Sequence, residues 1–163
     1  MAYQIPDATV IGHVHLKVSD LPRALNFYCG LLGFELMTKM GEDAAFISAG
    51  GYHHHIGLNT WYSKNGPPAP RNAPGLFHTA IRYPSRKDLA NIWKRIHEAH
   101  YPVAGFADHG VSEAIYLNDP DQNGVELYWD RPREAWPRDP QGKITLYTRE
   151  LDAAALLLEA DPT

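Results

Sequence analysis

Small or apolar residues alternate with polar ones near the start of the chain. Over residues 10–18 every second position is valine, glycine or leucine, and the positions between them include His13 and His15. An alternation of period two is typical of a β-strand with one buried face. Because side chains recur on the same face of a strand every second residue, His13 and His15 are expected to point the same way.

An amphipathic helix is predicted directly after this strand. Asp20 can cap its first turn, and Pro22 occupies a position where the missing amide hydrogen costs no hydrogen bond. Its apolar stripe consists of Leu21, Leu25, Tyr28 and Leu32. Gly33 is expected to end the helix. Three further strands are then predicted, over residues 34–40, 44–48 and 54–61.

The same order of elements recurs 65 residues further along the chain, where His78 takes the place of His13. A strand over residues 76–83 precedes a helix whose first turn contains Ser85 and Asp88, a pair similar to a capping box. Apolar residues follow at helical spacing (Leu89, Ile92, Trp93 and Ile96), and strands are predicted over residues 103–106, 113–117 and 125–129. Each repeat is therefore predicted to be a βαβββ module.

These modules divide the chain into four parts. They are a first βαβββ module over residues 9–62, a proline-rich linker over 63–75, a second module over 76–130 and a C-terminal extension over 131–163. The predicted fold class is α+β, with two four-stranded sheets that each pack one face on a helix. The other faces are expected to enclose a shared cavity, so that residues 9–130 form one domain overall.

The C-terminal extension is too apolar for a free tail. Its apolar residues include Trp136, Leu146, Tyr147, Leu151, Leu156, Leu157 and Leu158. Residues 151–160 could form a short helix, and the segment must pack either on its own body or on a partner subunit. Because most homo-oligomers are twofold dimers, we expect the extension to lie at or near the contact of a homodimer.

Composition argues against several classes of function. Apolar residues make up 44% and charged residues 21% of the 163 residues, as in soluble globular proteins. A net charge of −4 argues against binding of nucleic acid. No apolar run reaches the ~18 residues of a membrane span, and residues 1–6 lack a signal-peptide pattern. The single cysteine, Cys29, cannot form an internal disulfide, which fits a reducing cytoplasm.

Three residues could together bind a metal ion. Glu126 lies in an apolar and aromatic strand, where an unpaired buried carboxylate would cost several kcal/mol. His13 and His78 begin equivalent strands of the two modules. Taken alone, each of these residues is more often structural or solvated than a ligand. Taken together, two imidazoles and one carboxylate occupy one face of an octahedral ion and leave three positions open, as in non-haem Fe(II) oxygenases. Zinc prefers a tetrahedral site, and the chain has no cysteine cluster.

Other polar residues could assist chemistry at such an ion. Three histidines at 53–55 precede a predicted strand, and alternation would put the first and last of them on one face. The run could equally be a polar strand edge. His109 lies in a predicted loop, and Tyr116 lies ten residues before Glu126. An imidazole can carry a proton near neutral pH, and a phenol can hydrogen-bond an oxygen of a substrate.

Five motifs within residues 9–136 are shared with a known group of proteins. They are the run from Gly12-His13 to Asp20-Leu21, Phe27-Tyr28, Leu32-Gly33-Phe34, Phe77-His78-Thr79 and Asn118-Asp-Pro-Asp-Gln-Asn-Gly-Val-Glu126-Leu-Tyr. Through them the chain resembles the vicinal oxygen chelate superfamily, which includes glyoxalase I, bleomycin and fosfomycin resistance proteins and extradiol ring-cleaving dioxygenases. The resemblance implies paired βαβββ modules with His13, His78 and Glu126 as metal ligands.

Two strings are similar to catechol 2,3-dioxygenase-type members of this superfamily, at residues 50–61 and 108–120. In that branch the resemblance implies that His55 assists oxygen chemistry and that Tyr116 contacts the bound catecholate. It also implies an approximate match between His109 and a loop histidine. Glyoxalase I usually adds a second glutamate, and Gly57 stands at that position here, which favours a three-ligand site.

The expected function is therefore an extradiol dioxygenase that cleaves a catechol-like aromatic diol with O2. Fe(II) is the expected metal, with Mn(II) or another divalent ion as the alternative. One alternative function is a glyoxalase-like metal-dependent lyase, isomerase or thiol transferase. Another is a non-catalytic protein of the drug-sequestering kind that binds a small molecule in the cavity. The expected partners are a small aromatic substrate, O2 and a second copy of the chain, without nucleic acid or membrane.

Overall fold

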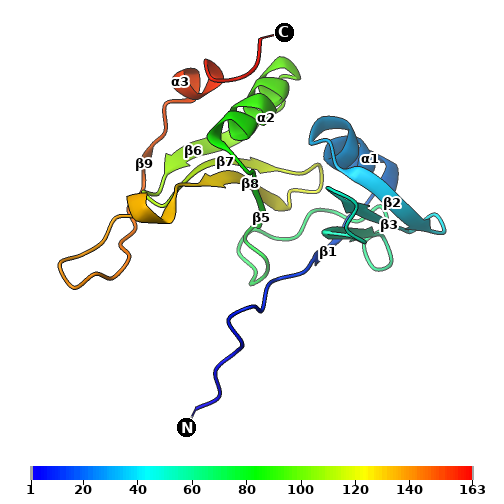
Figure 1. The fold of residues 1–163 in the computed structure, drawn as a ribbon. Coiled ribbons are helices and arrows are strands. Elements are labelled where there is room, and N and C mark those ends of the chain that lie inside the picture. The colour runs from blue at the N-terminus through cyan, green and yellow to red at the C-terminus, as the bar shows by residue number, and fades with distance from the viewer. Residues whose placement is uncertain (1, 163) are drawn as a thin grey trace. The chain divides into compact units, whose positions relative to one another are not determined.

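The computed structural model describes residues 2–162 and contains two compact units, Met1–Pro67 and Pro68–Thr163. Each unit has one β-sheet and one main helical segment that covers a face of that sheet (Figure 1). The predicted α+β class is confirmed, because each unit follows the order βαβββ.

The first unit is built on a four-stranded sheet. Its elements are β1 (Val14–Lys17), α1 (Leu21–Leu25), η1 (Asn26–Leu31), β2 (Glu35–Met40), β3 (Ala44–Ser48) and β4 (Ile56–Asn59). The strand order is β1-β4-β3-β2, in which β1 and β4 are parallel and the other pairs are antiparallel. The register of the parallel pair places His15 level with Gly57.

The helical segment of the first unit differs from the prediction. Asp20 caps it as expected, since its carboxylate accepts a hydrogen bond from the amide of Arg23 at 2.8 Å. The α-helix ends at Leu25, however, and continues as a π-helix over Asn26–Leu31. Two consecutive aromatic side chains of this π-helix, Phe27 and Tyr28, lie in the core, where they are 3% and 0% exposed. Packing of both rings therefore accompanies the departure from α-helical geometry.

The second unit is built on a five-stranded sheet. Its elements are β5 (Thr79–Arg82), α2 (Arg86–Glu98), β6 (Val103–Asp108), β7 (Ser112–Asn118), β8 (Gly124–Asp130), η2 (Arg133–Ala135), β9 (Arg149–Glu150) and α3 (Ala153–Leu157). The strand order is β5-β8-β7-β6-β9. Four strands were predicted here; the fifth, β9, comes from the C-terminal extension and pairs antiparallel with the end of β6.

Helix α2 follows the predicted pattern. The hydroxyl of Ser85 accepts a hydrogen bond from the amide of Asp88 at 3.1 Å and donates one to its carboxylate at 2.6 Å. Leu89, Ile92 and Ile96 are buried, as expected for the apolar face of a helix. The predicted capping and periodicity of this helix are confirmed.

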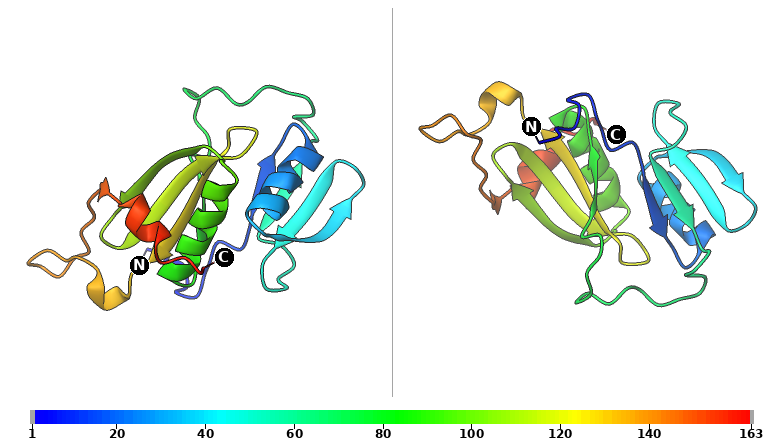
Figure 2. Two further views of the ribbon diagram at one scale, coloured as in Figure 1. Left: turned by 90° about the horizontal axis from the view of Figure 1, so that it is seen from above. Right: turned by 90° about the horizontal axis from the view of Figure 1, so that it is seen from below.

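The C-terminal extension packs on its own unit. Helix α3 lies against α2 (Figure 2), and the indole of Trp93 donates a hydrogen bond to the carbonyl of Ala153 at 3.0 Å. Leu151 and Leu156 are buried, and Lys87 forms an ion pair with Asp161. Of the two packing alternatives considered above, the structure therefore shows contact with the chain's own body. Leu146 and Leu158 remain 69% and 87% exposed.

Strands β1 and β5 begin later than the alternation predicted. Val14 and Thr79 are the first residues with sheet partners, and they are level with Ile56 and Val125. His13 and His78 thus each directly precede the first strand of their unit.

Candidate functional site

The first pair of site residues is His78 and Glu126, which the parallel strands β5 and β8 bring together. Ala80 is level with Glu126 in this ladder, and His78 lies two residues before Ala80, directly before β5. A side chain at Gly124 would overlap the Phe77 carbonyl oxygen and approach the Cβ of His78 to 3.1 Å. Glycine is therefore required there for the chain carrying His78 to approach β8 this closely.

Nε2 of His78 lies 2.9 Å from Oε2 of Glu126. The side chain of Glu126 is only 12% exposed and that of His78 is 30% exposed. The other ring nitrogen of His78, Nδ1, is buried and has no hydrogen-bond partner among residues 2–162. Glu126 is therefore the polar partner of this imidazole among the described residues.

Tyr116 contacts the second oxygen of the same carboxylate. It lies on β7 directly opposite Glu126, and its hydroxyl donates a hydrogen bond to Oε1 at 2.9 Å. Burial, followed by the hydrogen bond and the negative charge of Glu126, raises the pKa of Tyr116 above its ordinary value. The phenol is therefore held in its neutral form, able to donate.

His109 completes a row of four side chains. It follows β6 in the turn before β7, and its Nε2 lies 2.7 Å from the hydroxyl of Tyr116. The row runs from His78 through Glu126 and Tyr116 to His109. All four residues were candidates from the sequence, and the second unit brings them into direct contact.

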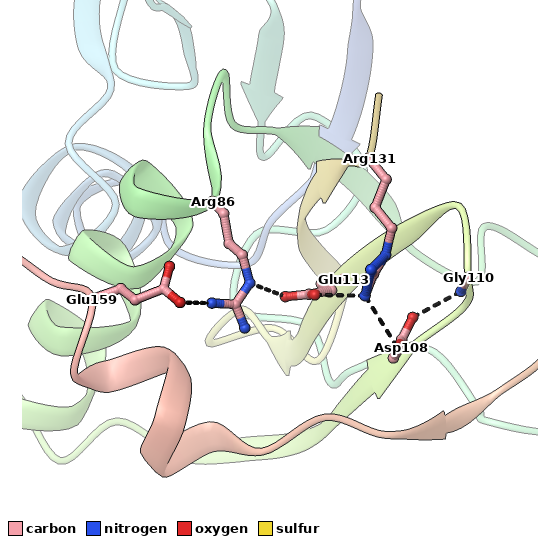
Figure 3. Close-up of polar contacts among 6 residues, drawn as sticks. All are labelled: Arg86, Asp108, Gly110, Glu113, Arg131 and Glu159. Carbon is pink, nitrogen blue, oxygen red and sulfur yellow. Dashed lines mark hydrogen bonds and ion pairs between the residues drawn. The ribbon is translucent and has the colours of Figure 1, made fainter. Parts of the chain in front are cut away.

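A partly buried ion-pair network centred on Glu113 supports the turn that contains His109. Asp108 accepts a hydrogen bond from the amide of Gly110 at 2.8 Å and pairs with Arg131 at 3.1 Å (Figure 3). Arg131 also pairs with Glu113 at 2.6 Å, and the other oxygen of Glu113 pairs with Arg86 at 2.6 Å. Sequence reasoning missed this network. The available signal was a charged residue, Glu113, at the start of a strand whose other residues are mostly apolar.

In the first unit, His13 contacts His54. The two ring centroids are 4.4 Å apart, and the ring of His54 also lies 5.0 Å from that of Phe46. Partial burial and the nearby His13 lower the pKa of His54, which favours its neutral form. Sequence reasoning gave His54 no role, because strand alternation was expected to turn it away from the face of its neighbours.

His55 has different neighbours. Its Nδ1 lies 2.9 Å from the hydroxyl of Ser48 and accepts a hydrogen bond from the amide of Ala49 at 3.3 Å, while its ring lies beside Tyr52. The strand predicted from residue 54 begins only at Ile56, so the alternation expected for the three histidines is wrong. The three histidines lie in a bend instead of a strand. As a result, the imidazole that lies beside His13 is that of His54.

A row of rings crosses one face of the first sheet beside His13. It continues from His54 to Phe46, then to His15 at 5.8 Å from Phe46, and ends at Trp61, 5.5 Å from His15. Burial and the nearby His13 lower the pKa of His15, so the neutral ring is favoured. Such rings provide apolar faces on which a flat ligand can stack.

The donor set of the second unit fits a divalent metal ion. Two ligands about 2.1 Å from one ion and at right angles lie about 3 Å apart, and Nε2 of His78 and Oε2 of Glu126 are 2.9 Å apart. Within each unit, no group of three His, Cys, Asp or Glu side chains among residues 2–162 forms a complete ligand set. None of the helices in the same range is long and apolar enough to cross a membrane.

Comparison with known proteins agrees with this geometry. A sequence model described as the Glyoxalase/Bleomycin resistance protein/Dioxygenase superfamily matches residues 10–127. The chain belongs to this superfamily. The resemblance to vicinal oxygen chelate proteins inferred from the motifs is thereby confirmed, and the fold places the chain among them.

Relatives within the superfamily include several dioxygenases. The chain is 40% identical over 157 residues to a catechol-2,3-dioxygenase of Bacillus subtilis (strain 168), covering 96% of this chain and 54% of that protein. It is 28% identical to biphenyl-2,3-diol 1,2-dioxygenase 3 of Rhodococcus globerulus, over 74% of this chain and 63% of that protein. The chain thus spans about half to two thirds of the length of these relatives.

A solved structure shares the fold. The lactoylglutathione lyase from Agrobacterium tumefaciens has a TM-score of 0.61 at 21% identity, covering 76% of this chain and 96% of that one. At this identity the likeness concerns the fold alone.

Proposed function

We propose that this protein is a metal-dependent extradiol dioxygenase that cleaves a catechol-like aromatic diol with O2. The observation that carries the proposal is the row of contacts from His78 through Glu126 and Tyr116 to His109. It joins a metal-binding pair of donors to a phenol and an imidazole, which are groups that can hydrogen-bond a substrate and move a proton. The 40% identity with a catechol-2,3-dioxygenase supports the assignment.

The metal ligands in this proposal are His13, His78 and Glu126. Fe(II) is the proposed ion and Mn(II) the alternative, because a set of two histidines and one carboxylate leaves positions for a diol and O2 on an octahedral ion. When bound, such an ion supplies the redox link between the diol and O2. The separation of Nε2 of His78 and Oε2 of Glu126, 2.9 Å, supports their assignment as neighbouring ligands.

Tyr116 and His109 are proposed to handle the proton. The neutral phenol of Tyr116 can donate to an oxygen of the substrate, and Nε2 of His109 is close enough, at 2.7 Å, to exchange a proton with that phenol. In the first unit, the imidazole of His54 lies beside that of His13, and His55 is the next residue in the sequence. We therefore assign the assisting role to this histidine pair, with His55 anchored through Ser48.

The ring row of the first sheet supports an aromatic substrate. It begins at His54 beside the proposed ligand His13 and ends at Trp61, which is 52% exposed. An aromatic ring that binds beside His13 would find ring faces along this row. The row is also unsuited to a fourth ligand, because the ring of His15 occupies the space above Gly57 where a side chain from β4 would project. This weighs against the four-ligand site that resemblance to glyoxalase I would imply.

The test is oxygen consumption by the metal-loaded protein. The 163-residue chain would be loaded anaerobically with Fe(II), Mn(II) or Zn(II) and supplied with catechol and substituted catechols. We expect O2 uptake with Fe(II) and a ring-opened product that contains both atoms of isotopically labelled O2. Thiol addition or isomerisation without O2 uptake, by folded and metal-loaded protein, would overturn the proposal in favour of the lyase or transferase alternative.

The proposal also includes a cytoplasmic homodimer. The single Cys29 fits a reducing compartment. The exposed side chains of Leu146 and Leu158 in the C-terminal extension would be buried against a second copy of the chain.

A further inference from the structure

Two adjacent imidazoles, those of His53 and His54, meet in the bend before β4. Nδ1 of His53 lies 2.8 Å from Nδ1 of His54. Successive side chains of a strand point to opposite faces, so the meeting of two neighbouring residues depends on the bend. Neither of these nitrogens belongs to the proposed ligands of the catalytic ion.

We propose that His53 and His54 form a second metal site, which binds a late divalent transition-metal ion such as Cu(II), Ni(II) or Zn(II). Two ligands about 2.1 Å from one ion and at right angles lie about 3 Å apart. The separation of the two Nδ1 atoms, 2.8 Å, fits neighbouring positions on one ion. The site goes beyond the proposed dioxygenase function and does not depend on it.

The donor atoms decide which class of ion the pair would bind. Both donors are imidazole nitrogens, which suit copper, nickel and zinc, whereas Mg(II) and Ca(II) prefer oxygen ligands. No third His, Cys, Asp or Glu side chain within residues 2–162 completes the set, so water would fill the remaining positions. Among divalent ions, the affinity of such a nitrogen site rises along the first row to Cu(II).

Aromatic neighbours hold each of the two imidazoles in place. The ring of Tyr52 lies beside that of His53, with centroids 4.1 Å apart and planes inclined by 35°. The ring of His54 contacts His13 at 4.4 Å and Phe46 at 5.0 Å. A pair that is already arranged for binding loses less conformational freedom when the ion arrives.

The hydrogens of the two rings are compatible with binding of an ion. A neutral imidazole carries one hydrogen, so without an ion one of the facing Nδ1 atoms donates to the other. Coordination needs both Nδ1 lone pairs, and the hydrogen must then be on Nε2 in each ring. Because His53 is exposed, exchange with water can move its hydrogen between the two nitrogens. The ion thereby takes the place of the hydrogen between the rings.

An ion bound at this pair would affect the first unit's part of the proposed catalytic site. His54 lies beside His13, a proposed ligand of the catalytic ion, and is one of the two histidines assigned the assisting role. Coordination of Nδ1 would fix the His54 ring to the second ion. Occupation of the second site is therefore expected to lower turnover, and this consequence alone rests on the proposed function.

The direct test is calorimetric titration of the full chain with Cu(II) in the absence of a diol. We expect the wild-type chain to bind one Cu(II) ion more than His53→Ala, or to bind that ion at least about 10-fold more tightly, since even an outer contact of a metal site is worth about 10–100-fold. This difference is expected whether or not the proposed catalytic ligands also take up an ion. His100→Ala, at an exposed histidine after α2, is the matched control and should bind like wild type.

Electron paramagnetic resonance identifies the ligands of the bound Cu(II). In His78→Ala, which lacks a proposed catalytic ligand, the spectrum should show two equatorial imidazole nitrogens, and His53→Ala added to this variant should abolish that pattern. Tyr52→Ala should weaken Cu(II) binding, and Tyr52→Phe, which keeps the ring, should retain it. Circular dichroism would confirm that each variant is folded.

Turnover measures the consequence separately. Added Zn(II) should inhibit the Fe(II)-loaded wild-type chain more strongly than Fe(II)-loaded His53→Ala, with each protein compared with itself in the absence of Zn(II). Equal inhibition would overturn the effect on His54. Equal Cu(II) stoichiometry and affinity in wild type and folded His53→Ala would overturn the second metal site, whatever the dioxygenase assay gives.

Discussion

Gly57 on β4 lies level with His15 on the parallel strand β1, and a Cβ atom at Gly57 would lie 2.8 Å from Cδ2 of the His15 ring. The imidazole therefore lies flat over a strand position that has no side chain. Because Phe46 and Trp61 flank the same ring, this contact fixes the middle of the ring row in the first unit.

The contact predicts that Gly57→Ala destabilises the first unit. The added methyl must displace the His15 ring, and overpacking of this kind costs about 1–3 kcal/mol in the free energy of unfolding. Urea denaturation would measure the loss. Gly105→Ala is the matched control, since a Cβ atom at that strand glycine has no neighbour within 4 Å. In the double variant with His15→Ala the penalty should largely disappear; a strictly additive double variant would contradict the contact.

A second prediction concerns the metal ligands. Replacement of His13, His78 or Glu126 by alanine should weaken binding of Fe(II) or Mn(II) at least about 100-fold, because loss of a ligand exceeds the 10–100-fold cost of losing an outer contact. Metal content after dialysis and calorimetric titration would measure the effect, with circular dichroism to confirm folding. His97→Ala, an exposed histidine of α2, should bind metal normally. Full metal occupancy in folded His13→Ala protein would remove His13 from the ligand set.

The ion-pair network predicts a large effect of Glu113→Gln on stability. The change leaves Arg86 and Arg131 facing a neutral amide in place of a buried carboxylate. Because hydrogen bonds to charged groups contribute about 1.5–3 kcal/mol each, and both arginines are partly solvated, we expect a loss of about 2–4 kcal/mol. Chemical denaturation would measure it against Glu98→Gln on the exposed end of α2. Equal stability of the two variants would show that the network contributes nothing.

A fourth prediction concerns alkaline pH. Burial, with a smaller effect of Asp88, raises the pKa of Tyr83 above its ordinary value, and Tyr116 is shifted in the same direction. Because the pKa of the phenol is higher in the folded than in the unfolded chain, deprotonation favours unfolding. The contribution of the protonated phenol to the free energy of unfolding is therefore complete below pH ~10 and is lost as the pH rises further. Thermal melts across this range should show a flatter decline in Tyr83→Phe. Tyr62→Phe, at a residue 91% exposed, should leave the profile unchanged.

The proposed homodimer gives a fifth prediction. Leu146→Ser combined with Leu158→Ser should shift the protein toward monomer, because both side chains are exposed in the extension and would lose an apolar contact with the partner. Light scattering at several protein concentrations would measure the mass. Because neither residue belongs to the packed side of the extension, the melting temperature should stay close to that of wild type. A wild-type protein that is monomeric throughout would contradict the dimer.

The sequence was sufficient to single out, as candidates, the four residues that meet in the second unit. Tyr116 and Glu126 stand on two strands joined by a short turn, and the hairpin places them opposite each other. His78 and His109 lie at strand ends beside this pair. The alternation and turns that predict this hairpin explain why residues chosen for their chemistry also come together in space.

The extension and the histidine run could not be predicted in the same way. Strand β9 has two residues and no periodicity, and its partners on β6, Ala107 and Asp108, lie far earlier in the chain. His54 and His55 lie in a bend before β4, where side chains do not alternate between two faces as they do in a strand. Their neighbours could therefore not be predicted from alternation. The Glu113 network joins residues more than 70 positions apart in sequence, from Arg86 to Glu159, by side-chain contacts alone.

Strand β9 also changes what the second unit presents to other chains. In the order β5-β8-β7-β6-β9, β6 would be the outermost strand without it. The free amide and carbonyl groups of an outermost strand can pair with a strand of another molecule, which is a common route to aggregation. By pairing with Ala107 and Asp108, the extension closes the end of that edge nearest His109. Proteolytic loss of the last fifteen or so residues would reopen it, and self-association through strand addition is the expected fate of the clipped protein.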